Sequence, residues 1–315
     1  MYFPYLRGKQ FELIALKELI GLLAKNNNKV SPIIEPVKDS STLKTTIQGL
    51  VSKNINFNIV VNPKVGDMQK DRDILEFLTF LTKGLAGYSN FQMAVILNEK
   101  ENHKTIINIL NKFIAGTKIG LTLIHNAEFE NIGKIVKEYE TVTKVKYNVL
   151  HLRKTGKRYY RNFDLGTVVE LDDCFSSQEK NADYKLVEES NFSEEHLYYK
   201  QDGFVGFSDF LTIGDIYAVS GFLPYAVAIH ISYSNSSKKI KIRHFVSDSN
   251  DDTSDIAGKF KEALDKLIAW CNTTKFKTQA IDSFFDMHKT GHFPGLGTVK
   301  KLSIMNHIEV VLRLI

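Results

Sequence analysis

The chain has 315 residues, of which 43% are hydrophobic and 11% aromatic, so it can build a large core and is not composed like a disordered segment. Lysine and arginine number 41 against 36 for aspartate and glutamate, and the net charge of +5 is spread along the chain. A dedicated nucleic-acid binder usually carries a basic stripe or tail instead. The two cysteines, Cys174 and Cys271, match no metal-ligand spacing and exclude a disulfide framework.

The start of the chain, Met1 to Arg7, is too short and too polar downstream for a signal peptide. No run in the sequence approaches the roughly 18 apolar residues that a membrane-spanning helix needs. We therefore expect a cytoplasmic protein with no membrane partner.

Short apolar or β-branched runs alternate with longer segments of helical periodicity through the first two thirds of the chain. This order is typical of β/α units around a parallel sheet. Runs such as Ala94 to Leu97 are apolar without alternation, as expected where both faces of a strand are buried. The predicted strands are Tyr2 to Leu6, Val30 to Glu35, Phe57 to Asn62, Gln92 to Asn98, Ile119 to His125, Val145 to His151, Thr167 to Leu171 and Phe204 to Ser208.

Between these strands, apolar residues recur three and four positions apart, as in Ile106, Ile109, Leu110 and Phe113. Units of about 25 to 30 residues suit either a barrel or a doubly wound sheet. The count of strands and the lack of a Gly-x-Gly-x-x-Gly turn favour the barrel. The predicted fold is α/β, a TIM-like (β/α)8 barrel, with a long open α/β sheet as the alternative.

The pattern changes after residue 210. Pro224 to Tyr233 and Lys239 to Val246 flank a turn-rich patch and predict an inserted β-hairpin. Three C-terminal helices are predicted at Asp255 to Trp270, Thr278 to His288 and Thr298 to Leu312, the first being a candidate for the eighth barrel helix. We expect residues 1–210 to form the barrel core and residues 211–315 to complete or cap it, and the sequence leaves open whether the hairpin plugs the mouth.

Polar side chains close the predicted strands, at the end of a β/α barrel where binding and catalytic residues gather. Strand ends are also polar in many proteins, so a structural role is the alternative for each. The set is Arg7, Glu35, Asn62, Asn98, His125, His151, Arg153, Glu170, Asp172, Ser208 and Asp209.

Carboxylates at these ends suggest two kinds of chemistry. Glu35 lies between Pro32 and Pro36, which restrain the backbone, and so suits a ligand or a base; the alternative is an ion pair with Arg7 or Lys9. Glu170 and Asp172 form a second cluster that is able to hold Mg²⁺ or Mn²⁺ or to share a proton, the alternative being a loop that caps a helix.

His125 and His151 close neighbouring strands, so we expect the two imidazoles to lie close together at the mouth. An imidazole there is able to ligate a metal or to move a proton. The alternative is a structural, hydrogen-bonded histidine.

Two basic segments are candidates for phosphate contacts. Arg153 to Arg161 interleaves cations with aromatic residues, although a solvated loop gives the same pattern. Lys300 follows a glycine-rich start of a helix, where free amides bind anions, but no P-loop sequence is present.

Asp248, Asn250 and Asp252 have the spacing that opens a calcium loop. Thr253 and Lys259 replace the glycine and the glutamate which such a loop requires, so an EF-hand is excluded. Another kind of metal site and an acidic loop that caps the next helix remain open.

Two stretches, Met1 to Leu16 and Pro32 to Pro36, resemble the "beta protein" family of bacterial and phage proteins. Gly203 to Asp209, His244 to Asp252 and Pro294 to Lys301 resemble one branch of it. The resemblance implies a barrel-like fold, no settled activity, a setting among phage-defence genes and a small nuclease-like partner.

The leading hypothesis is a phage-defence barrel that binds a phosphorylated ligand, nucleotide or nucleic acid at its mouth, with metal-assisted phosphodiester hydrolysis if it is an enzyme. Its alternatives are a non-catalytic partner or regulator of a nuclease-like protein, contacting it through Asp248 to Asp255 and the C-terminal helices, and a barrel enzyme for a small carboxylated or sugar substrate. Under the leading hypothesis, phosphate is contacted by Arg7, Lys9 and Arg153, and the rest of the ligand by Asn62, Asn98, Ser208, Asp209 and Lys300. The metal ligands or the base are Glu35, Glu170 and Asp172. The residue that moves protons is His125 or His151.

Overall fold

The structure is a computed structural model that describes residues 1–69, 71–85, 87–218 and 223–315. It divides into two compact units. The first consists of Met1–Asp173 and Leu197–Phe210, and the second of Cys174–His196 and Leu211–Ile315. The predicted change near residue 210 coincides with one boundary between them, and the segment 174–196 joins the second unit.

Eight parallel strands of the first unit close into a barrel in the order β1-β2-β3-β4-β5-β6-β7-β9. All eight predicted strands are present. The predicted TIM-like barrel is confirmed, and the alternative of a long open sheet is excluded. Their bounds are β1 Tyr2–Leu6, β2 Ile33–Ile34, β3 Phe57–Val60, β4 Phe91–Leu97, β5 Gly120–His125, β6 Val145–His151, β7 Val168–Asp172 and β9 Gly206–Asp209.

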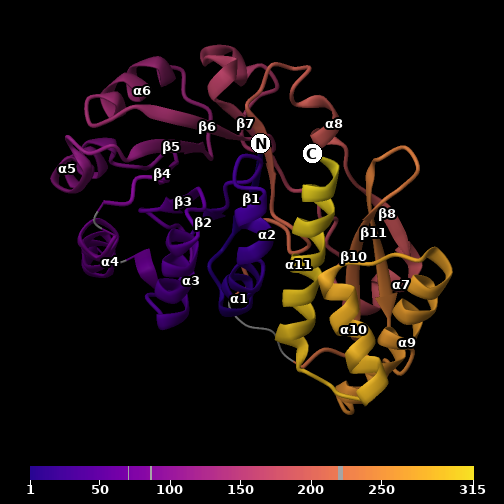
Figure 1. Cartoon of the computed structure of the whole chain (residues 1–315). Coiled ribbons are helices and arrows are strands. Elements are labelled where there is room, and N and C mark those ends of the chain that lie inside the picture. The colour runs from indigo at the N-terminus through magenta and orange to yellow at the C-terminus, as the bar shows by residue number, and fades with distance from the viewer. Residues whose placement is uncertain (70, 86, 219–222) are drawn as a thin grey trace. The chain divides into compact units, whose positions relative to one another are not determined.

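Helices follow most of these strands and lie outside them, as Figure 1 shows for α3 to α6. Polar caps set where two of them begin. The Ser40 hydroxyl accepts a hydrogen bond from the Leu43 amide at 3.2 Å, and Asn102 Oδ1 accepts one from the Thr105 amide at 3.2 Å. The bounds are α1 Gln10–Glu18, α2 Ile20–Lys25, α3 Ser41–Ser52, α4 Asp71–Gly84, α5 His103–Ile114, α6 Ile132–Glu140 and α8 Glu195–Tyr198, with short 3-10 turns η1 Asp67–Gln69, η2 Tyr159–Asn162 and η3 Leu165–Thr167.

Alternate residues of the strands point inward and fill the barrel, so the interior is a packed core rather than a pore. Strand β4 is buried along its whole length, which explains why its sequence does not alternate. The inner cluster is Phe3, Tyr5, Ile33, Val60, Ala94, Ile96, Ile124, Tyr147, Val149, Val169, Leu171 and Phe210.

The second unit is built on an antiparallel sheet in the order β10-β11-β8. The predicted hairpin is present as β10 Ala228–Ser234 and β11 Ile240–Val246, and β8 Glu189–Ser193 adds a strand that the sequence did not predict. The other elements are η4 Asn181–Asp183, α7 Tyr184–Val187, α9 Ile256–Thr274, α10 Gln279–Thr290 and α11 Leu296–Leu314.

Helix α9 packs against β10 and β11 in this second unit, so its assignment as the eighth barrel helix was wrong. Helix α11 is buried on nearly all sides, and its polar residues bond to β10. Asn306 Nδ2 donates to the Ser232 carbonyl at 2.8 Å, and His307 Nδ1 lies 2.9 Å from the Ser232 hydroxyl. Capping of the barrel by these elements stays a prediction. Among the described residues, no helix combines the length and the apolar character needed to cross a membrane.

Candidate functional site

Glu35 lies at the carboxyl end of β2 with only 1% of its surface exposed. Its Oε2 accepts hydrogen bonds from the Tyr5 hydroxyl at 2.8 Å and from Arg7 Nη1 at 3.3 Å, and its Oε1 accepts one from the Lys64 amide at 2.8 Å. The Arg7 guanidinium also lies over the rings of Tyr5 and Phe210, 5.5 Å and 5.3 Å from their centroids. The predicted ion pair of Glu35 with Arg7 is therefore confirmed, and this carboxylate is held by three neighbours.

Gly8 allows the end of β1 to come this close to Glu35. Its φ is +60°, and a Cβ there would lie 2.8 Å from the Glu35 carbonyl oxygen. A larger residue would push the two strand ends apart, so this glycine fixes the arrangement of Arg7 and Glu35. Lys9 follows at the start of α1 and is half-buried.

Arg153, after β6, makes a second ion-pair cluster at the same end of the barrel. Its Nε lies 3.4 Å from Asp172 Oδ1 and its Nη1 lies 3.7 Å from Asp173 Oδ2, while Nη2 donates to the Asp173 carbonyl. Both arginines predicted to face phosphate thus already contact carboxylates that were predicted to hold metal or act as base.

The predicted metal set is not gathered at one point. Val169 and Leu171 belong to the inner core, so Glu170 between them is on the outer face of β7. Glu35, in contrast, is on the inner side, where it contacts Tyr5. In the part of the chain that the structure describes, no group of three or more histidine, cysteine, aspartate or glutamate side chains is arranged to hold a metal ion.

The expectation that His125 and His151 lie together was wrong. His125 follows the inward-facing Ile124 and points outward, where its ring meets Tyr159 and Phe163 with centroids 5.6 Å and 4.9 Å away. His151 points inward, with its ring 5.5 Å from that of Phe210. His125 pairs in register with Leu150, the residue before His151. Because successive residues of a strand face opposite sides, the two imidazoles lie on opposite sides of the barrel wall.

His125 has the surroundings of a structural histidine. It is fully buried, and its Nε2 lies 3.1 Å from Asn148 Oδ1. Burial lowers the pKa of His125 to about 4, so the ring is neutral near pH 7.

Other polar residues at the strand ends connect neighbouring strands. Asn62 bonds to both the amide and the carbonyl of Ile96, at 2.8 Å and 2.9 Å. The Tyr2 hydroxyl donates to Asp209 Oδ1 at 2.9 Å, and the Ser208 hydroxyl donates to the Phe3 carbonyl. These bonds tie β3 to β4 and β9 to β1. Asn98 follows β4, where its carbonyl accepts from the Glu101 amide at 3.0 Å.

The acidic loop lies in the second unit, and each of its three predicted ligands has a partner. Asp248 Oδ1 contacts Lys185 Nζ at 2.7 Å and Lys266 Nζ at 2.9 Å. Asn250 bonds to Ser247, and Asp252 accepts from Ser254 and Lys259. Lys300 also lies in this unit, exposed in the first turns of α11.

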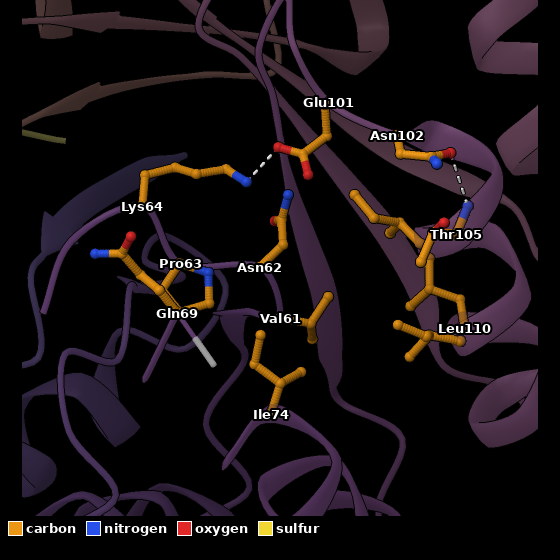
Figure 2. Close-up of a pocket in the computed structure, with 12 residues that line it drawn as sticks. Val61, Asn62, Pro63, Lys64, Gln69, Ile74, Glu101, Asn102, Thr105 and Leu110 are labelled. Carbon is orange, nitrogen blue, oxygen red and sulfur yellow. Dashed lines mark hydrogen bonds and ion pairs between the residues drawn. The ribbon is translucent and has the colours of Figure 1, made fainter. Parts of the chain in front are cut away.

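A cavity of about 180 Å³ opens at the carboxyl ends of β3 and β4, among η1, α4 and α5. Figure 2 shows Lys64 and Glu101 joined at its polar side and aliphatic side chains opposite them. The lining consists of Val61, Asn62, Pro63, Lys64, Gln69, Ile74, Glu101, Asn102, Thr105, Ile106, Ile109 and Leu110.

Two positive groups meet in this cavity. Lys64 Nζ pairs with Glu101 Oε2, and the side chains are 28% and 18% exposed. Asn102 and Thr105 line the same space and belong to the start of α5, whose amides carry the positive end of the helix dipole. Glu101 is thus a carboxylate bound where an anion is favoured.

Of these residues, sequence reasoning identified Asn62 and missed Lys64, Glu101 and Asn102. A signal was present, because Glu101-Asn102 precedes the helical pattern that begins near Ile106, at the place of a helix cap directly after a barrel strand. Lys64 and Glu101 lie in the loops beyond the predicted strands Phe57 to Asn62 and Gln92 to Asn98.

Comparison with known proteins adds no family. No family model and no curated protein matches the chain. Among solved structures, it is similar to a candidate dihydrodipicolinate synthetase from Pseudomonas aeruginosa, with TM-score 0.39 and 11% identity over 66% of this chain and 70% of that chain. It is also similar to the spore cortex-lytic enzyme SleL of Bacillus cereus, with TM-score 0.36 and 8% identity over 97% of this chain and 74% of that one. The barrel is established by the strand order of the chain itself.

Proposed function

We propose that the barrel binds a small phosphorylated ligand in the cavity at the carboxyl ends of β3 and β4. One observation carries the proposal: Lys64 and the start of α5 lie at one side of a cavity whose other side is aliphatic. An ammonium group and a helix N-terminus both favour a phosphate, while Ile74, Ile106 and Leu110 suit the organic part of a ligand.

The paired state of Lys64 fits this role. A cation in a half-buried pocket needs an anionic partner, and Glu101 supplies one when the ligand is absent. A phosphate with a charge near −2 competes with the single charge of the Glu101 carboxylate for the Lys64 ammonium group. Ligand binding then requires only that the Glu101 side chain rotate away from Lys64.

The predicted site residues at the strand ends position the backbone near Lys64 in this proposal. Glu35 accepts the Lys64 amide hydrogen, so the Arg7, Tyr5 and Glu35 network fixes the backbone from which Lys64 extends. Asn62, two residues earlier, is fixed by Ile96. Hydrolysis of the ligand, an Mg²⁺ or Mn²⁺ cofactor, the phage-defence setting, the nuclease-like partner and the membership in the "beta protein" family all stay predictions.

The test uses matched probes that differ by a phosphate: ribose 5-phosphate against ribose, and adenosine 5′-monophosphate against adenosine, with binding followed by calorimetry. We expect the phosphorylated member of a pair to bind and its partner to bind at least tenfold more weakly. Lys64→Met should weaken binding by about tenfold or more, because a charge-assisted hydrogen bond contributes about 1.5–3 kcal/mol.

Glu101→Gln should have the opposite sign and tighten binding several-fold, since it removes the competing charge while keeping a similar shape. Lys134→Met, at an exposed lysine on α6, is the control for loss of one positive charge. Equal weakening by Lys64→Met and Lys134→Met, or no binding by any phosphorylated probe, would overturn the proposal.

A further inference from the structure

Two histidines of the second unit face each other across the hairpin. His230 on β10 and His244 on β11 are direct partners in the antiparallel register, and their Nδ1 atoms lie 2.8 Å apart. Directly opposite residues have Cβ atoms about 4.5–5.5 Å apart, which lets two imidazole nitrogens reach one point. The pair is distinct from the barrel and belongs to no site described above.

An aromatic frame holds the two rings in place. The Tyr184 ring centroid lies 4.6 Å from each imidazole centroid, and Phe175 packs edge-on to His230 at 5.2 Å. Tyr184 and Phe175 are buried, and the Tyr184 hydroxyl accepts a hydrogen bond from the Gln178 amide at 3.1 Å. The rings therefore keep their mutual geometry without a metal, which lowers the cost of organising two ligands.

We propose that His230 and His244 form a two-imidazole site for a divalent transition-metal ion, with Cu²⁺ as the best fit. Two nitrogens about 2.0 Å from a metal and 90° apart are about 2.8 Å apart, whereas tetrahedral ligands of zinc are about 3.3 Å apart. The 2.8 Å between the two Nδ1 atoms is the length of their hydrogen bond, so when the ion replaces the shared hydrogen the rings need to turn, but not to separate, to occupy neighbouring corners of the tetragonal geometry of Cu²⁺. Water or an external ligand fills the other positions.

The protonation states suit metal binding at neutral pH. Burial lowers the pKa of His230 to about 3, with His244 and Lys300 nearby adding to the shift, and burial lowers the pKa of His244 to about 4. Both rings are therefore neutral near pH 7. In the hydrogen-bonded pair one Nδ1 carries a hydrogen, which moves to Nε2 of the same ring when both Nδ1 lone pairs bind the metal, so no net proton is released near neutral pH.

The first test titrates untagged, chelator-treated protein with Cu²⁺, Ni²⁺ and Zn²⁺ by calorimetry and records electron paramagnetic resonance of the Cu²⁺ form. We expect one Cu²⁺ per chain, with nitrogen hyperfine structure from two imidazoles, and affinity falling from Cu²⁺ to Ni²⁺ and Zn²⁺. His230→Gln and His244→Gln should each weaken Cu²⁺ binding by about tenfold or more. His292→Gln, at an exposed histidine in the same unit, should leave it unchanged.

A second measurement does not depend on variants that fold. In the ¹⁵N NMR spectrum of the unaltered protein, substoichiometric Cu²⁺ should broaden the imidazole signals of His230 and His244 before those of the other histidines. The proposal is overturned if His288 and His292 broaden first, or if His292→Gln lowers the affinity as much as His230→Gln does.

Discussion

The two units use buried polar side chains in different ways. In the barrel, the strand-end groups are bonded to neighbouring strands: Glu35 to Tyr5, Arg7 and the Lys64 amide, and Asn62 to the Ile96 backbone. In the second unit, His230 and His244 meet each other inside an aromatic frame. Polar residues at the strand ends of this barrel therefore hold the strands together, and the site that we propose for a ligand is the adjacent cavity, where the Lys64–Glu101 pair is partly exposed.

The largest change in the free energy of unfolding is expected from Glu35→Ala. It leaves the Arg7 guanidinium, 12% exposed, beside an empty position, and removing one member of a buried ion pair costs about 3–5 kcal/mol of the free energy of unfolding. The measurement is urea denaturation followed by circular dichroism. Glu140→Ala, at an exposed residue of α6, serves as the control and should change stability by less than about 0.5 kcal/mol.

Trp270, the single tryptophan, lies on α9 of the second unit and gives a second signal. In Glu35→Ala the fluorescence transition of Trp270 should move less than the circular dichroism transition, because the substitution acts on the barrel. An unchanged stability of this variant would show that the Glu35 network does not hold the mouth together.

A smaller effect is expected from His125, and it depends on pH. The pKa of His125 is lowered from 6.5 to about 4 in the folded chain, so unfolding takes up a proton at intermediate pH. The burial of His125 does not lower the free energy of unfolding above pH 6.5, and it lowers that free energy increasingly as the pH falls toward 4, by on the order of 3 kcal/mol in all.

His125→Gln removes this dependence. Its free energy of unfolding should therefore fall less steeply between pH 6.5 and 4 than that of the unaltered chain, whatever its stability at pH 7. Equal slopes for the two proteins would contradict the neutral, buried state of His125.

Most of the barrel could be predicted from the sequence, because its strands are buried on both faces and separated by amphipathic helices. Runs such as Phe91–Leu97 show this in composition alone. The strand β8 could not be found this way, because Glu189–Ser193 is short and polar. It forms a strand by pairing with β11. The hydrophobic pattern of a segment is a weak predictor of a strand where the pairing partner lies far away in the chain.

The candidate site was predictable in location and less so in detail. The carboxyl ends of the strands follow from the fold, but the direction of a side chain follows from register, which separated His125 from His151. Which side chains pair also depends on the tertiary structure. Arg7 and Arg153 were predicted to face a ligand, and the structure shows them in contact with carboxylates.

Binding of a phosphorylated ligand in the cavity is tested most directly by a methyl NMR titration of the unaltered chain with adenosine 5′-monophosphate and with adenosine. We expect saturable shifts of the methyl groups that line the cavity, those of Ile74, Ile106, Ile109 and Leu110, at lower concentrations of the monophosphate than of the nucleoside. Shifts confined to methyl groups outside this cavity, or equal shifts with both compounds, would contradict binding of a phosphorylated ligand in the cavity.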